Sequence, residues 1–123
     1  MIFEGFLRVY KLSNVAKKGE MPKNRLVLKS EHYYGDRMIG YSRQYTAMGA
    51  DQRVDKLVRI WRDETIRVQD YVITEDDGEQ YRIDMVQHLL DENNLKVTDL
   101  TLYRLEDNYE IYTEEAERVL PEI

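Results

Sequence analysis

Histidines and clustered carboxylates are the residues of this 123-residue chain that could do chemistry, and they are few. His88 with Asp91 and Glu92 is the only combination that resembles a set of metal ligands, because imidazole and carboxylate groups commonly bind divalent ions. The same residues follow a predicted strand, where a polar loop is the simpler explanation. His32 has no such neighbours and is expected to pack or to form a hydrogen bond.

Acidic residues also gather at Asp76, Asp77 and Glu79, a pattern that could hold calcium or supply paired carboxylates. The regular oxygen-ligand spacing of a calcium loop is missing, so we interpret them as turn residues. The chain has no cysteine, no glycine-rich phosphate loop and no serine nucleophile motif. We therefore predict that the protein is not an enzyme and that it uses neither a cofactor nor a metal.

The elements that would position these residues are predicted to be β-strands. Residues 54–62 and 68–74 are rich in β-branched and aromatic side chains, and turn residues bound both runs. Asp77-Gly78 then predicts a hairpin turn, because glycine readily takes the positive φ that tight turns require. Apolar and polar side chains alternate along the next strand. The side chains of that strand that should face the core are Tyr81, Ile83 and Met85.

Two further strands and a long N-terminal loop are predicted before these. Residues 2–12 form one strand with apolar side chains on both faces, and Gly5 indicates a bulge or a bend. Residues 25–33 form the next strand. The loop between them, residues 13–24, is either a solvated connection or a contact for DNA or an acidic partner. The basic side chains that would make this contact are Lys17, Lys18 and Lys23. The inward-facing side chains of the second strand should be Leu26 and Leu28.

Several aromatic and apolar residues are candidates for an interface. Residues 39–48 are predicted to form a strand. Trp61, the only tryptophan, is either a core residue or an anchor between subunits, where tryptophan often concentrates binding energy. Residues 97–105 carry apolar side chains on both faces, which implies a cover or a partner because isolated domains rarely expose such patches. The C-terminal tail is the obvious candidate for that cover. The interface candidates are Tyr41, Tyr45, Trp61, Tyr103, Leu105, Tyr112, Ala116 and Leu120.

The negative charge of the chain is concentrated in its C-terminal tail. Residues 106–123 have seven acidic residues and one basic residue, a net charge of −6, whereas residues 1–105 have 17 of each sign and are neutral. A neutral body has no general attraction to DNA. Thr113 can cap a short tail helix that Pro121 ends, and such a helix is stable only when docked. Its apolar stripe would be Tyr112, Ala116 and Leu120.

Length and composition indicate a single domain with a modest core. Tyrosine is unusually frequent, with ten residues against two phenylalanines, and tyrosine suits surfaces that are half buried against a partner. No segment approaches the roughly 18 apolar residues of a membrane span, so we expect no membrane partner. The predicted fold is all-β, a small barrel or sandwich of six to eight strands over residues 1–105. Residues 106–123 form the acidic tail with its short helix.

A series of short motifs resembles one known family. In chain order they are Gly40-Tyr41-Ser42, Ala47 to Ala50, Arg53-Val54-Asp55, Val58-Arg59-Ile60, Asp77-Gly78 and Tyr81-Arg82-Ile83. Over residues 31–105 this order resembles the head-closure proteins of tailed bacteriophages, which are also called head-tail joining or stopper proteins.

The resemblance implies a β-barrel virion protein of the head-tail neck, assembled in the cytoplasm of the host bacterium. Copies would form a ring, a dodecamer in the family, below the portal and its adaptor, close the head after DNA packaging and dock the tail. The implied partners are other copies of the chain, the portal-bound adaptor protein, the tail-completion or tail-terminator protein and, weakly, the packaged DNA in the channel. The residues to which the resemblance assigns a channel-facing loop are Tyr34, Gly35, Asp36, Arg37 and Met38. The loop of residues 13–24 is an alternative for the same role.

A second class of function is a monomeric β-barrel that binds a peptide or single-stranded nucleic acid. Its stacking groups would be Tyr33, Tyr34, Tyr41 and Tyr45. The neutral body argues against the nucleic-acid version. A small enzyme is a third and weaker hypothesis, because no converging acid, base or nucleophile set is visible in the sequence.

Overall fold

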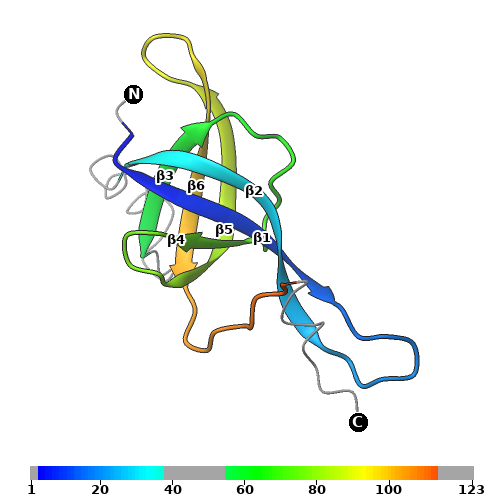
Figure 1. Ribbon diagram of the computed structural model, residues 1–123. Helices are drawn as coiled ribbons and strands as arrows, with labels where there is room; N and C mark the ends of the chain where they lie inside the picture. The colour runs from blue at the N-terminus through cyan, green and yellow to red at the C-terminus, as the bar shows by residue number, and fades with distance from the viewer. Residues whose placement is uncertain (1–2, 38–54, 114–123) are drawn as a thin grey trace.

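Six β-strands form one closed sheet in the computed structural model, which describes residues 3–37 and 55–113 (Figure 1). Around the barrel the order is β1, β2, β3, β6, β5, β4, and all neighbours are antiparallel. This confirms the all-β prediction. In chain order the strands are β1 (Gly5–Asn14), β2 (Asn24–Asp36), β3 (Lys56–Trp61), β4 (Tyr71–Thr74), β5 (Gln80–Leu90) and β6 (Lys96–Arg104).

The predicted tail helix begins after Thr113, so it lies outside the described residues. Residues 3–37 and 55–113 contain no helix, and therefore none that is long and apolar enough to cross a membrane.

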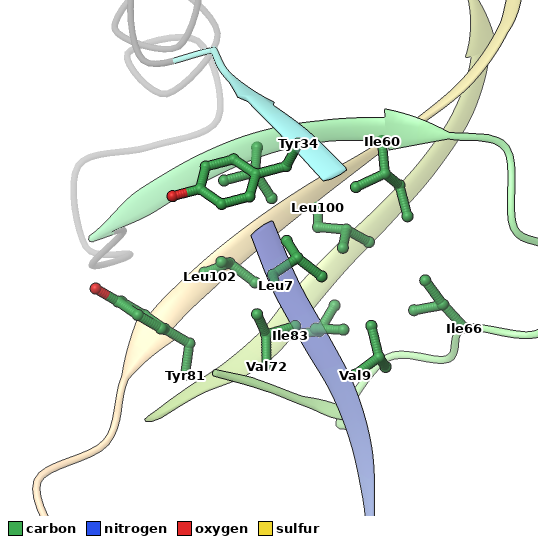
Figure 2. Close-up of a cluster of buried hydrophobic side chains, with 11 residues drawn as sticks. Leu7, Val9, Tyr34, Ile60, Ile66, Val72, Tyr81, Ile83, Leu100 and Leu102 are labelled. Carbon is green, nitrogen blue, oxygen red and sulfur yellow. The ribbon is translucent and has the colours of Figure 1, made fainter. Parts of the chain in front are cut away.

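Apolar side chains from the strands fill the interior of the barrel (Figure 2). Leu7 and Val9 of β1 meet Leu100 and Leu102 of β6 there, and all four are fully buried. Burying a side chain of this size contributes roughly 1.5–3 kcal/mol each. Ile66, in the connection between β3 and β4, joins the same core. The barrel is therefore a packed core without a pore, as expected for a small closed sheet.

A β-bulge in β2 reverses which side chains face the core. Val9 of β1 pairs with Ser30, but Tyr10 pairs with Leu28, which leaves Lys29 as the extra residue. One inserted residue shifts the alternation of side chains by one position. Even-numbered residues of β2 therefore face inward from Ser30 onward and outward up to Leu28. Leu26 and Leu28 were predicted to face inward, but both lie on the outer side, where Leu28 is 48% exposed and Leu26 is buried in a separate outer cluster. That prediction was wrong.

A second bulge, at Asp84 in β5, has the same effect. Ile83 pairs with Leu102 of β6 and Met85 pairs with the adjacent Thr101, so Asp84 has no opposite residue. Val86, not Met85, then packs against the core. The prediction that Met85 faces the core was therefore wrong for the same physical reason.

The β1–β2 hairpin extends beyond the barrel (Figure 1). Past Tyr10, β1 pairs with β2 but no longer with β4, so residues 11–27 form a projecting arm. The connection between the two strands, residues 15–23, is shorter than the predicted loop because both strands are longer than expected. At its base, the Asn14 carboxamide oxygen accepts hydrogen bonds from the backbone N–H groups of Ala16 and Lys23, both 3.0 Å.

The segment that follows β6, residues 105–112, crosses the outer face of the barrel, and we call it the strap. Tyr10, Leu26 and Tyr71 form a second buried cluster on that outer face, and Leu105 and Tyr109 of the strap pack against it. The tail was predicted to cover β6, whereas the buried residues beneath the strap belong to β1, β2 and β4. Backbone bonds fix the end of the strap beside β2, where the Leu26 N–H donates to the Glu110 carbonyl over 2.9 Å.

Candidate interaction surfaces

Four aromatic side chains gather on the outer surface near the start of β1. The rings of Phe6 and Tyr33, directly opposite each other on β1 and β2, have centroids 5.2 Å apart in an edge-to-face arrangement. Phe3 and Trp61 are arranged in the same way at 5.5 Å. Tyr33 is 65% exposed and Trp61 is 43% exposed. Because edge-to-face contacts are favourable, these four rings, which we call the aromatic cluster, form an ordered apolar surface.

A pocket of about 440 Å³ opens beside the aromatic cluster and has an acidic rim. Its carboxylates are those of Glu4, Glu75 and Asp76. Asp76 pairs with Lys56, whose Nζ lies 3.0 Å from the carboxylate. Glu4 and Glu75 make no ion pair with any described residue. Aromatic rings beside unpaired carboxylates suit a cationic side chain, which gains both cation–π and charge interactions.

The tip of the arm has the opposite character. Lys17 and Lys18 are exposed and form no ion pair within the described part of the chain. Met21 is 85% exposed, while Lys23 is held by Glu20 at 3.3 Å. The three lysines therefore lie together on one connection, as the sequence indicated. The tip offers two exposed ammonium groups and a flexible apolar side chain.

A network of polar side chains closes one end of the barrel around Lys56. Its Nζ lies 5.6 Å from the ring centroid of Tyr34 and 5.7 Å from that of Tyr81. The carboxylates of Asp76 and Asp77 form ion pairs with this Nζ at distances of 3.0 and 3.6 Å. The Tyr81 hydroxyl donates to Asp77 over 2.6 Å. The network neutralises a lysine that projects from the inner face of β3, as a largely buried ammonium group requires.

This network is not arranged for proton transfer. Burial alone would lower the pKa of Lys56, but the hydrogen bond to Asp76 and the nearby Asp77 raise it. Burial and the bond to Asp77 raise the pKa of Tyr81. Burial opposes ionisation of Asp76, yet hydrogen bonds from Lys56 and Thr74 lower its pKa. Each of these three groups keeps its ordinary charge at neutral pH, so none is suited to act as a general acid or base.

Ser30, His32 and Asp63 lie within hydrogen-bond distance but do not form a catalytic relay. The Nε2 atom of His32 lies 3.0 Å from the Ser30 hydroxyl and 3.0 Å from the Asp63 carboxylate. A relay needs serine on one ring nitrogen and aspartate on the other. Burial raises the pKa of Asp63, but hydrogen bonds from Thr65 and the nearby His32 lower it overall. The expectation that His32 forms a hydrogen bond is confirmed.

His88 is not brought together with Asp91 in a ligand set. Its Nδ1 lies 2.9 Å from the Thr98 hydroxyl, and the Asp91 carboxylate accepts the N–H groups of Asn93 and Leu95 within the β5–β6 turn. Within residues 3–37 and 55–113, no three His, Cys, Asp or Glu residues are grouped to hold a metal.

Asp77 and Gly78 form the predicted β4–β5 turn, with Gly78 at φ +67° and its N–H bonded to the Thr74 carbonyl over 2.8 Å.

The residues assigned to the channel-facing loop belong largely to a strand. β2 continues to Asp36, with Gly35 opposite Arg59 and Asp36 opposite Val58 of β3. Tyr34 is only 3% exposed, so the predicted break at this residue was wrong and Tyr34 cannot stack on a ligand. Arg37 follows the strand. The last residue of the assignment, Met38, lies outside the described residues.

The interface candidates have different environments. Trp61 is exposed, so the core interpretation was wrong. Leu105 packs on the outer cluster, and the Arg82 guanidinium lies 5.0 Å from the Tyr103 ring. The Tyr112 N–H donates to the Leu26 carbonyl over 2.8 Å. Tyr41, Tyr45, Ala116 and Leu120 lie outside the described residues.

The sequence missed the aromatic cluster as a unit. Of its four rings, Tyr33 was predicted as a stacking group and Trp61 as an interface candidate. Their meeting with Phe3 and Trp61 depends on the pairing of β1 with β2 and on how β3 lies beside them. Local patterns do not determine such pairing.

Comparison with known proteins finds a similarity in fold to a solved structure. No protein-family model matches the sequence, and no curated protein matches it. The fold is similar to the solution structure of protein SF1141 from Shigella flexneri 2a, a structural genomics target, with a TM-score of 0.60 and 15% sequence identity. The alignment covers 85% of this chain and 96% of that chain. At this identity the similarity shows the shared fold alone.

Proposed function

We propose that this protein is a structural component of a bacteriophage neck that closes the filled head and provides the docking site for the tail. The observation that carries the proposal is the pair of unlike surfaces on one small barrel, the aromatic cluster with its acidic rim and the basic tip of the arm. A protein that presents two different adhesive surfaces can join copies head to tail into a ring.

Two further features support an assembly role over a catalytic one. The polar groups gathered around Lys56 and around His32 serve hydrogen bonds and ion pairs within the fold. The family motifs that fall in the described residues occupy regular positions: Val58 to Ile60 lies in β3, Asp77-Gly78 in a turn and Tyr81 to Ile83 in β5. A barrel with these motifs fits the resemblance to head-closure proteins.

The proposed partners follow the same resemblance. They are other copies of the chain in a ring, a dodecamer in the family, the portal-bound adaptor protein above it and the tail-completion or tail-terminator protein below it. Packaged DNA would be held back without tight binding, which suits the neutral charge of residues 1–105. Because Tyr34 to Asp36 belong to β2, the proposed channel-facing role falls on Arg37 and Met38. The tail helix proposed after Thr113 would dock on its own barrel, on the next subunit or on the adaptor.

The alternative is a monomeric module that binds a peptide. The exposed rings of the aromatic cluster favour it, because such rings are common at binding surfaces. The acidic rim formed by Glu4 and Glu75 repels phosphates and so disfavours nucleic acid. A peptide for this site would have to be basic.

Electron microscopy of particles from an infection that lacks this gene tests the proposal. We expect filled or emptied heads separated from free tails, and joined virions when the intact gene is supplied in parallel. Purified heads from the deletion should also join added tails only after the protein is supplied. Normal joined virions without the gene would reject the neck assignment and favour the peptide-binding module.

A further inference from the structure

The two ends of β1 carry surfaces that complement each other. At its start lies the pocket lined by aromatic rings and by the carboxylates of Glu4 and Glu75, which form no ion pair within residues 3–37 and 55–113. Beyond its other end lies the arm tip, with the exposed side chains of Lys17, Lys18 and Met21. A lysine beside an aromatic ring and a carboxylate gains two favourable interactions, and a methionine packs readily on ring edges.

These surfaces cannot meet within one chain. β1 runs from Gly5 to Asn14, ten residues of continuous strand, so the surfaces lie roughly 30 Å apart at the usual rise per residue. The arm also points away from the barrel, and its tip and the start of β1 lie at opposite ends of the molecule (Figure 1). Contact between the tip and the pocket therefore requires a second copy of the chain.

We propose that the arm tip of one copy binds in the aromatic pocket of the next copy, with Lys17 or Lys18 against the carboxylates and Met21 against the rings. The contact joins two different surfaces, so it leaves each copy with one free tip and one free pocket. Repetition then produces a ring if the rotation closes and a filament if it does not. The inference rests on the proposed neck function for its biological setting, where it would be the contact between neighbouring subunits.

Engineered cysteines can test this contact directly, because the natural chain has none. Glu20→Cys labels the arm tip and Glu4→Cys labels the pocket rim, and both residues are exposed. Glu92→Cys, an equally exposed position in the β5–β6 turn, is the matched control. The full-length variants carry tags of different mass, are mixed in pairs and are treated with a short bifunctional maleimide.

We expect the tip and rim variants to form a cross-linked heterodimer, while the tip variant forms none with the control variant. Adding Lys17→Glu and Lys18→Glu to the tip variant should lower the heterodimer yield by about tenfold, because like charges then face each other. Adding Glu75→Lys to the rim variant should restore much of the yield. Circular dichroism should show that all variants keep the same β-sheet signal.

Equal cross-linking of the rim and control positions, or no heterodimer at any protein concentration with or without purified heads, would overturn the contact. The gene-deletion experiment gives an independent result. A neck defect without the tip-to-rim cross-link would leave the proposed function standing and reject this interface. The cross-link in a protein whose deletion gives normal virions would support the interface and reject the neck function.

Discussion

At the scale of single residues, a glycine makes room for a buried aromatic ring. Gly5 lies opposite Tyr34 in the pairing of β1 with β2. A Cβ atom at Gly5 would be 2.5 Å from the Cε1 and Cζ atoms of the Tyr34 ring. The ring therefore occupies the space that a side chain at residue 5 would need. Gly5 was predicted to mark a bulge or a bend, but its role is to admit this ring.

Gly5→Ala should destabilise the protein by about 1–3 kcal/mol, the usual cost of overpacking a buried site. The free energy of unfolding from urea titration measures the loss. The control is the same substitution in a Tyr34→Leu background, where the ring is absent and the added methyl group should cost much less. An equal loss in both backgrounds would show that the ring is not the cause.

At the scale of elements, the strap shows how a strand that is apolar on both faces is accommodated. The Gln80 side chain donates to the Tyr109 carbonyl and accepts its N–H, both over 2.8 Å. The Tyr109 ring then lies 5.4 Å from that of Tyr71, edge to face. The outer faces of β1 and β4 are thus buried by the same chain.

Tyr109→Ala should lower the free energy of unfolding by about 1–2 kcal/mol, because it removes a half-buried ring and its aromatic partner contact. Hydrogen exchange should also become faster at the Leu26 amide, whose N–H is bonded to the strap. Asp107→Ala, at an exposed strap position, should change neither quantity. Unchanged exchange at Leu26 in the Tyr109 variant would contradict a stabilising role for the strap.

The turns and strands also show which structural features could be predicted from the sequence and which could not. The turn at Asp77-Gly78 was predictable because a tight turn depends on the residues within it. The facing of Leu28 and Met85 was not, because each lies next to a bulge whose position is set by the partner strand. Trp61 was uncertain for a similar reason. Alternation in the sequence shows which residues of β3 share a face, but it does not show which of the two faces points outward.

At the scale of the whole molecule, carboxylates make stability depend on pH. Asp63, Asp76 and Asp77 have pKa values below the ordinary 3.8 because hydrogen bonds outweigh the opposing effect of burial. A lowered pKa in the folded state means that the unfolded chain takes up protons first as the pH falls. The stability contributed by these groups is present above pH 3.8 and is lost as the pH falls through their folded-state pKa values.

We therefore expect the free energy of unfolding to be steady near neutral pH and to fall progressively below about pH 4. Urea titrations between pH 7 and pH 2.5 would measure it. Asp77→Asn should flatten this dependence, because it removes one of the responsible carboxyl groups, while the exposed Asp107→Asn should not. A stability that rises on acidification would contradict the assigned interactions.

The order of strands around the barrel has a consequence for how the chain folds. The β1–β2 and β5–β6 hairpins join residues that are near in sequence, and hairpins form within about 1–10 μs. Closure instead requires residues as distant as Val9 and Val72, on β1 and β4, to find each other. Such closure costs chain entropy before it gains contacts. We therefore expect the joining of β1 to β4 to set the folding rate, and a newly made chain to expose that edge of β1 longest.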